Sequence, residues 1–346
     1  MFSSDEKTPT SPQAGADALL LRLLVSDSKT LDWLQIHRPD MTWARPFEAD
    51  SEYDMGSALY YAACIGFRDA VRRLLDKGVD PNTEGGFYGS PLRAAAHYGH
   101  KMTCLLLLHR GARIEDVDVN GSAALWYAAD GGHEGVVKAL VQNGALIEAG
   151  GEGTGTAVYA AASNRHVGVV RYLLSAGSDV NSATRFGKTA LRGAANNGDL
   201  EMIELLVEKG AQIERGDELG QTPLLRAALS GNEEAVRLLL ERGANIEVRD
   251  KRGQTAASWA AWHGRVAALR VLLDKGANME SKDGEGQTAL HRAAAGGKEF
   301  AVKILIERGA DVRVEDEGWL TPYEWAQRHG HFGIADILTK AGSGEG

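Results

Sequence analysis

The stretch most suggestive of chemistry is glycine-rich and runs from Gly151 to Gly155, with the sequence Gly-Glu-Gly-Thr-Gly. Loops of this type can hold phosphate because their backbone N–H groups approach the ligand closely. A dinucleotide site needs a strand before the loop and a helix after it, within a βαβ unit. Here the stretch connects two helical segments, so we interpret it as a loop and not as a phosphate site.

Histidine and cysteine could form a metal site. His97 and His100 are three residues apart, and Cys64 precedes His97 by 33 residues, an interval that recurs throughout the chain. Positions related by such an interval lie about 10 Å apart in stacked helices. Two ligands of one zinc ion must each lie about 2.0–2.3 Å from it. We therefore expect no metal, and we interpret the histidines that open helices, such as His100 and His133, as capping or packing residues.

Acidic residues are plentiful, but they recur at the same interval, at Asp217, Asp250, Asp283 and Asp316. This regularity is typical of turn residues, because aspartate side chains hydrogen-bond to nearby backbone. The sequence contains no nucleophile elbow, zinc-protease, kinase or Walker motif. We predict a chain that is not an enzyme and that needs no cofactor.

The dominant feature is a 33-residue period in glycine. One series falls at positions 78, 111, 144, 177, 210, 243, 276, 309 and 342, and a second runs from Gly66 to Gly330 with Arg165 as its single exception. Self-similarity at such a period indicates one small unit stacked many times.

The segment that begins at Gly220 shows the unit. Thr222 can cap the following helix, and Pro223 suits its first turn. Gly231 ends this helix, and an apolar-faced second helix runs on to Gly243. Each unit is therefore predicted as helix, turn, helix and an extended finger loop. We number each repeat from the residue five before the threonine, so that Asp217 is position one.

This pattern resembles the ankyrin-repeat family, whose unit has 33 residues and carries Thr-Pro-Leu-His-x-Ala. The resemblance covers about 52–342 in nine repeats and implies an all-α solenoid with finger loops. Outside the repeats at 51–342, the Ser-, Thr- and Pro-rich composition of 1–14 predicts a disordered tail, and helix-forming residues predict a helical N-terminal cap at 15–50, with the remnant of a larger domain as the alternative; a short tail follows at 343–346.

Departures from the family pattern are informative. The family histidine, which usually ties neighbouring fingers together, survives only as His291, so elsewhere the ties are expected to be made by other residues or to be weaker. Repeat four has Arg165 in place of the turn glycine and is the expected soft joint, with Asn164 a candidate for the left-handed turn. Repeat nine carries Tyr323, Glu324 and Gln327 at normally apolar or alanine positions, which is typical of a polar closing cap.

Bulk properties limit the partners and the compartment. The net charge of −9 argues against nucleic-acid binding. No apolar run is long enough for a membrane helix, so no membrane insertion is expected. The two cysteines and the polar start favour a reducing compartment, the cytoplasm, with the nucleus as an alternative.

The resemblance implies recognition on a concave surface made by the fingers and first helices, called the inner face below. Its exposed positions are two, three and five of each repeat, including Gln221, Gln254 and Gln287, and the pair after the two alanines. Exposed aromatic and arginine side chains there are typical of binding hot spots. The predicted partner-binding residues are Phe87, Tyr98, Arg185, Phe186, Lys188, Leu219, Leu229, Lys251, Arg252, Trp262 and His263.

These residues predict a protein or peptide partner, apolar with acidic groups, across repeats five to seven. The alternative is that Phe186 and Trp262 pack against neighbouring fingers. The leading function is a protein-interaction scaffold that is monomeric. Two other functions stay open: head-to-tail self-assembly, and a ligand-sensing array of a larger signalling system, because the repeat at 88–95 resembles arrays of fungal NACHT-type receptors.

Overall fold

The computed structural model describes residues 58–151 and 153–343, and the chain divides between Gly150 and Gly151 into two compact units. The tail predicted at 1–14 and the cap predicted at 15–50 lie outside the described residues, as do residues 344–346. Each unit is considered by itself.

The first unit contains three helix pairs. They are α3 (Ala58–Cys64) with α4 (Arg68–Asp76), α5 (Pro91–His97) with α6 (Lys101–His109), and α7 (Ala124–Asp130) with α8 (Glu134–Gln142).

The second unit continues the same alternation. Two short paired strands, β1 (Gly150–Gly151) and β2 (Gly155–Thr156), lie in the glycine-rich loop that opens repeat four. The first helices of the repeats are α9 (Ala157–Ser163), α11 (Ala190–Asn197), α13 (Pro223–Ser230), α15 (Ala256–Trp262), α17 (Ala289–Ala295) and α19 (Pro322–Arg328). The second helices are α10 (Val167–Ser175), α12 (Leu200–Glu208), α14 (Glu233–Glu241), α16 (Val266–Asp274), α18 (Glu299–Glu307) and α20 (Phe332–Ser343).

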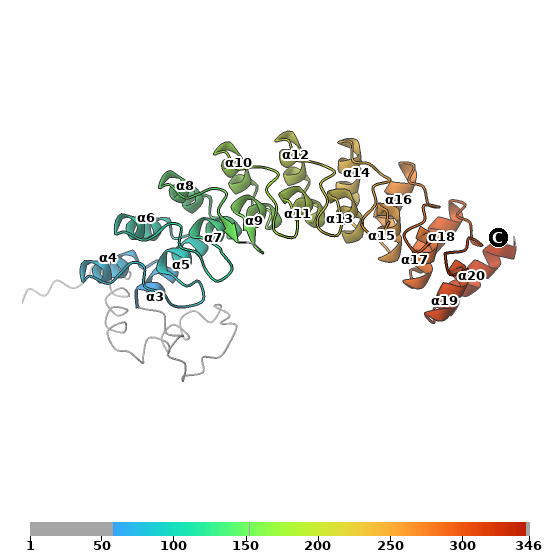
Figure 1. The fold of residues 1–346 in the computed structure, drawn as a ribbon, viewed down its shortest axis with the longest axis horizontal. Coiled ribbons are helices and arrows are strands. Elements are labelled where there is room, and N and C mark those ends of the chain that lie inside the picture. Colours follow the sequence, from blue (N-terminus) through green and yellow to red (C-terminus); the bar gives the residue numbers. More distant parts are fainter. Residues whose placement is uncertain (1–57, 152, 344–346) are drawn as a thin grey trace, which may run out of the picture. The chain divides into compact units, whose positions relative to one another are not determined.

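Within each unit the helices form two layers. First helices of successive repeats pack side by side, and second helices form a parallel row behind them, with the fingers extending from the row of first helices (Figure 1). The predicted all-α stack of helix–turn–helix units is confirmed. In the part of the chain that the structure describes, no helix is long and apolar enough to cross a bilayer.

The core follows from the small residues of the first helix. Ala227 and Ala228 are fully buried, and so are their counterparts in the neighbouring repeats. Because alanine has a short side chain, adjacent first helices approach closely, and leucines such as Leu224 and Leu239 fill the space between the two layers. The apolar pattern of the sequence thus becomes one continuous core along each unit.

The helix starts agree with the sequence. The Thr222 hydroxyl accepts the N–H of Leu225, and Pro223 occupies the first turn of α13. Thr321 and Glu324 form a reciprocal capping box at the start of α19. At the closing end, Gln327 is exposed where the equivalent Ala294 is buried, which gives the last repeat a polar outer side.

The helix–helix turn of repeat four needs a correction. Arg165 itself adopts the left-handed conformation, with φ of 66°, while Asn164 has φ of −103°. The Arg165 guanidinium donates to the Asn197 carbonyl of the next repeat. Asn164 therefore does not replace the missing glycine; the arginine takes over the same backbone geometry and adds a contact between repeats.

The two glycine series meet different surroundings, and this generates a prediction. Gly99 has φ of +78°, and a Cβ atom there would lie 2.5 Å from Nδ1 of His133. Gly111 has φ of +90°, with no atom within 4 Å of such a Cβ. Gly111→Ala should lower the free energy of unfolding by about 1–2 kcal/mol through backbone strain alone. Gly99→Ala should cost about 1 kcal/mol more, because His133 must leave its hydrogen bond to the His97 carbonyl. Urea unfolding followed by circular dichroism measures both, and equal losses would contradict the contact.

Candidate protein-interaction face

The finger turns of the inner face are shaped by the residue at position one. In repeats three and six to nine it is aspartate, and one of its carboxylate oxygens accepts the N–H groups of positions three and five at 2.8–3.0 Å. These aspartates are Asp118, Asp217, Asp250, Asp283 and Asp316. The prediction that the periodic aspartates are turn residues is confirmed.

The second carboxylate oxygen fastens most of these fingers to a first helix. In four repeats the donor is the side chain at position ten of the same repeat. The pairs are Tyr127 hydroxyl to Asp118 (2.5 Å), Trp259 indole to Asp250 (2.9 Å), Arg292 guanidinium to Asp283 (2.8 and 2.5 Å) and Trp325 indole to Asp316 (2.7 Å). Sequence reasoning missed this role, although the recurrence of a long hydrogen-bond donor at position ten was a usable signal.

These bonds change the acidity of the carboxylates. Burial raises the pKa of Asp118, but the hydrogen bonds from the Tyr127 hydroxyl and from the N–H groups of Ser122 and Asn120 outweigh it, and the pKa lies below its ordinary value. The pKa of Asp316 is lowered against the effect of burial in the same way, by the Leu320 N–H and the Trp325 indole. Such carboxylates stay ionised and occupied, so they are poor acids or bases.

Repeat six differs from this scheme. The second oxygen of Asp217 pairs at 2.7 Å with Arg192, which lies at position nine of the preceding repeat, and both side chains are buried. The residue at position ten of repeat six, Arg226, instead donates to two amide oxygens, those of Gln221 (3.2 Å) and Asn196 (2.6 Å).

Neighbouring fingers are tied to one another through their backbones. The N–H of position two donates to the carbonyl of position three in the preceding repeat, from repeat five to repeat nine. The bonds are Glu218 to Phe186 (3.0 Å), Lys251 to Leu219 (3.0 Å), Gly284 to Arg252 (2.9 Å) and Glu317 to Glu285 (3.2 Å). The fingers therefore present their tips in a fixed register.

His291 keeps the family histidine and makes the expected contact with the next finger. His291 contacts Thr288 through Nδ1, at 3.0 Å to the hydroxyl oxygen, and the Leu320 carbonyl through Nε2, also at 3.0 Å. In the first repeat the position is Tyr60, whose hydroxyl accepts the Tyr88 N–H at 3.2 Å. At Tyr60, therefore, another residue makes the tie that the histidine makes elsewhere in the family, as expected.

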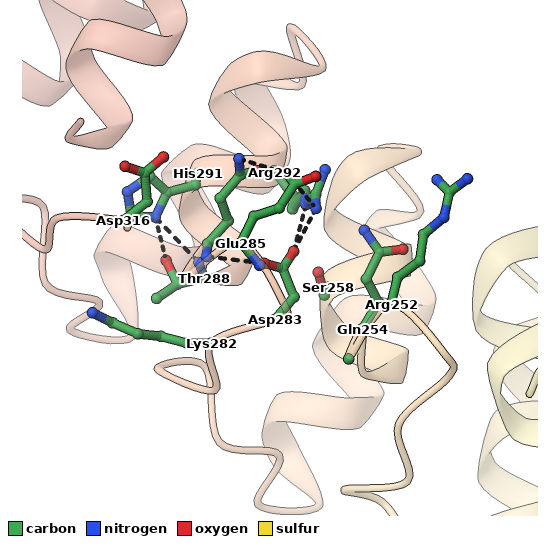
Figure 2. A network of polar contacts seen from close by, with 12 residues as sticks. Arg252, Gln254, Ser258, Lys282, Asp283, Glu285, Thr288, His291, Arg292 and Asp316 are labelled. Carbon is green, nitrogen blue, oxygen red and sulfur yellow. Dashed lines mark hydrogen bonds and ion pairs between the residues drawn. The ribbon is translucent and has the colours of Figure 1, made fainter. Parts of the chain in front are cut away.

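A polar network in repeats seven and eight is centred on Arg292, which is paired with the aspartate of its finger. Arg292 contacts Asp283 and, at 3.4 Å, Glu285, and the Gln254 amide, with its oxygen turned toward Arg292, accepts from Nε and Nη2 at 3.2 Å. Arg252 extends away from this network (Figure 2). The paired arginine is thus part of the framework, and Arg252 is available to a partner.

The predicted residues on the fingers of repeats five to seven form an exposed group. Phe186 is 41% exposed, with the guanidinium carbon of Arg185 at 5.1 Å and Nζ of Lys188 at 5.8 Å from its ring centroid. Leu219 is 60% exposed on the next finger. Lys251 and Arg252 are exposed, and Lys188 is half-buried.

The predicted helix residues are less exposed than expected. Trp262 is half-buried, because the guanidinium of Arg292 in the next repeat covers its ring at 4.7 Å. His263 is half-buried and stacks on Trp259 at 5.6 Å, and Leu229 is also half-buried. The expectation that Trp262 is fully solvated is wrong; its ring packs against Arg292, which lies on helix α17 of the next repeat and not on a finger.

Two further expectations of exposure are corrected. Tyr98 is half-buried and packs against a core cluster that includes Tyr60 and Cys64, whereas Phe87 is 81% exposed. Position five is buried in repeats six to eight, at Gln221, Gln254 and Gln287, and each side-chain amide bonds to another side chain: that of Arg226, Arg292 and Glu285 respectively.

The histidines that open second helices have structural roles where their contacts are defined. Nε2 of His100 lies 2.9 Å from the Cys64 carbonyl, and Nε2 of His133 lies 2.7 Å from the His97 carbonyl. Burial raises the pKa of the Cys64 and Cys104 thiols to about 12, so neither is a ready nucleophile. Across residues 58–151 and 153–343, no three His, Cys, Asp or Glu side chains are placed to hold a metal ion.

Comparison with known families gives a clear match. A family model described as ankyrin repeats, in three copies, matches six overlapping stretches of the chain, at residues 24–118, 59–151, 92–184, 143–217, 191–283 and 257–344. Every described helix pair lies within these stretches.

The finger carboxylates give a testable pH effect. Tyr127→Phe removes one donor to Asp118, so the pKa of Asp118 should rise from its lowered value toward about 3.9. Because the lowered pKa stabilises the fold above the unfolded-state value, the variant should lose about 1 kcal/mol of unfolding free energy at pH 7. The loss should shrink as the pH falls through the lowered pKa.

Carboxyl carbon NMR titration and urea unfolding at pH 7 and pH 3 measure these effects. Tyr323→Phe, at a half-buried phenol whose hydroxyl accepts from the Gln327 amide and donates to no finger aspartate among the described residues, is the matched control. An unchanged Asp118 titration would show that the hydroxyl does not tune the carboxylate.

Proposed function

Because this chain belongs to the ankyrin-repeat family, whose repeats generally mediate protein–protein interaction, we propose that it is a non-catalytic scaffold that binds a partner protein on the inner face of repeats five to seven. The observation that carries the proposal is Phe186. It is an aromatic side chain, 41% exposed at a finger tip and flanked by two cations.

The neighbouring fingers extend this contact. Leu219 adds a second exposed apolar side chain, and Arg252 adds a guanidinium that points away from the framework network (Figure 2). Aromatic and arginine side chains are the groups that most often dominate binding energy at interfaces. An apolar side chain of a partner would lie against Phe186 and Leu219 on this surface.

Charge favours an acidic partner. At positions two, three and five of repeats five to seven there are four cations, Arg185, Lys188, Lys251 and Arg252, and one anion, Glu218. The whole chain has a net charge of −9, so this surface has the opposite balance. Complementary charge steers association and selects among partners.

The hydrogen bonds between fingers support a binding role. The backbone carbonyls of Phe186, Leu219 and Arg252 each accept a hydrogen bond from the next finger. The backbone at these residues is therefore fixed before a partner binds. Preorganisation of this kind reduces the entropy lost on binding. Because the finger carboxylates are fully engaged in the turns, the same surface offers binding and not acid–base catalysis.

Affinity purification from cell extract, followed by mass spectrometry, tests the proposal with Phe186→Ala/Arg252→Ala as the variant. Partners captured by the parent chain should bind the double variant at least about tenfold more weakly, since each truncation of a hot-spot residue costs more than about 1 kcal/mol of binding free energy. The matched control is Phe300→Ala/Arg270→Ala, which makes the same changes at exposed residues of the second-helix layer. Trp262 is left unchanged because its loss would disturb Arg292.

Thermal unfolding should be the same for both double variants and the parent chain. Partners that bind the Phe186→Ala/Arg252→Ala variant as well as they bind the parent, or that are lost only in the control, would refute the inner face as the binding site.

A further inference from the structure

Arg226 is the one position-ten arginine of repeats six to nine that has no carboxylate partner within residues 153–343. We propose that Arg226 is the docking point for an aspartate or glutamate side chain of the bound partner. This inference rests on the proposed function and specifies the chemistry of its binding site.

Arg226 lacks a carboxylate partner in the described part of the chain because a second arginine pairs with the aspartate of its finger. In repeat eight, Arg292 pairs with the aspartate of its own finger. In repeat six the equivalent oxygen of Asp217 is already paired with Arg192, from position nine of repeat five. Position nine of repeat five and position ten of repeat six are thus both arginine, and the buried Arg192 is the one that pairs with the Asp217 carboxylate.

The contacts of Arg226 leave it short of negative charge. A guanidinium has five N–H donors. Its Nη1 donates to Gln221 and its Nη2 to Asn196, while Nε is buried without a partner. Both acceptors are neutral amides. One N–H on each terminal nitrogen is therefore left for a ligand, and within residues 58–151 and 153–343 no carboxylate forms an ion pair with the guanidinium.

Electrostatics supports the same conclusion. Burial lowers the pKa of Arg226 first, and repulsion from Arg192 lowers it further, although Asp217 acts in the opposite direction. An added carboxylate would offset both unfavourable effects. Charge-assisted bonds between arginine and carboxylate are about twice as strong as neutral hydrogen bonds.

The surroundings specify the rest of the ligand. Arg226 is half-buried, so it is reachable from solvent, and Leu229 lies on the same face of α13 three residues later. The Ser230 hydroxyl donates to the same Asn196 oxygen that Arg226 uses. Burial lowers the pKa of His263 first, and the charges of Arg265, Lys298 and Arg226 lower it further. The site fits a carboxylate next to an apolar side chain.

The test uses random 12-residue peptides displayed on phage and selected on the full-length chain. Synthetic versions of the selected peptides are then measured by fluorescence anisotropy. Selected peptides should carry an acidic residue at a fixed place, and its change to Asn or Gln should weaken binding about tenfold, as for a lost hydrogen bond between charged groups. Arg226→Gln should weaken binding by a similar factor and should abolish the preference for the acid.

Arg270→Gln, the same change at an exposed second-helix residue, is the matched control and should bind as the parent does. Circular dichroism melting checks that Arg226→Gln is folded. If peptides depend on Phe186 and Arg252 but are indifferent to Arg226→Gln, the carboxylate site is wrong and the proposed function stands. If no peptide is selected, or none depends on Phe186 and Arg252, both are wrong. If a 20-residue oligothymidine binds through Arg226 and displaces the peptides, the ligand is a phosphate and the inference is overturned.

Discussion

The inner face depends on one interaction, the aspartate at position one of the finger that accepts hydrogen bonds on both carboxylate oxygens. One oxygen closes the turn by accepting two backbone N–H groups, and the other attaches the turn to a first helix. Without the first set of bonds, positions two and three would have no fixed direction. Without the second, the finger would have no fixed place on the helix. The first set of bonds recurs in repeats three and six to nine, and the bond to position ten of the same repeat recurs in four of these.

This interaction also separates framework from display. The oxygens of these carboxylates are occupied by hydrogen bonds of the framework. In repeats six to eight the glutamine at position five is buried, and in four repeats the donor at position ten bonds to the aspartate. The side chains at positions two and three take no part in these bonds. On the fingers of repeats six and seven this leaves Leu219 and Arg252 exposed; in repeat five the Thr184 hydroxyl replaces the aspartate as acceptor of the Phe186 and Lys188 N–H groups, and Phe186 is exposed at the tip.

The sequence allowed the fold to be predicted because its signals are local. The 33-residue period places every helix, and the cap at Thr222 and the buried alanines follow from residue type alone. The site was predicted less well because exposure depends on the neighbouring repeat. Trp262 looks solvated until Arg292 of the next repeat covers it, and the Gln254 side chain looks exposed until its amide oxygen accepts from the same Arg292. Arg165 shows the same limit, since its left-handed backbone is accompanied by a bond to Asn197 in the following repeat.

A shared acceptor explains how a regular array can acquire a distinct site without a new structural element. Position nine and position ten both lie within reach of finger carboxylates, the first from the preceding repeat and the second from its own. When only one of them is a cation, as at Arg292, the charges balance and the residue belongs to the framework. When both are cations, as at Arg192 and Arg226, one carboxylate cannot pair with both, and the less buried arginine is left without an ion-pair partner among the residues that the structure describes. Specificity then arises from an imbalance within a conserved geometry, and the backbone of repeat six need not differ from that of its neighbours.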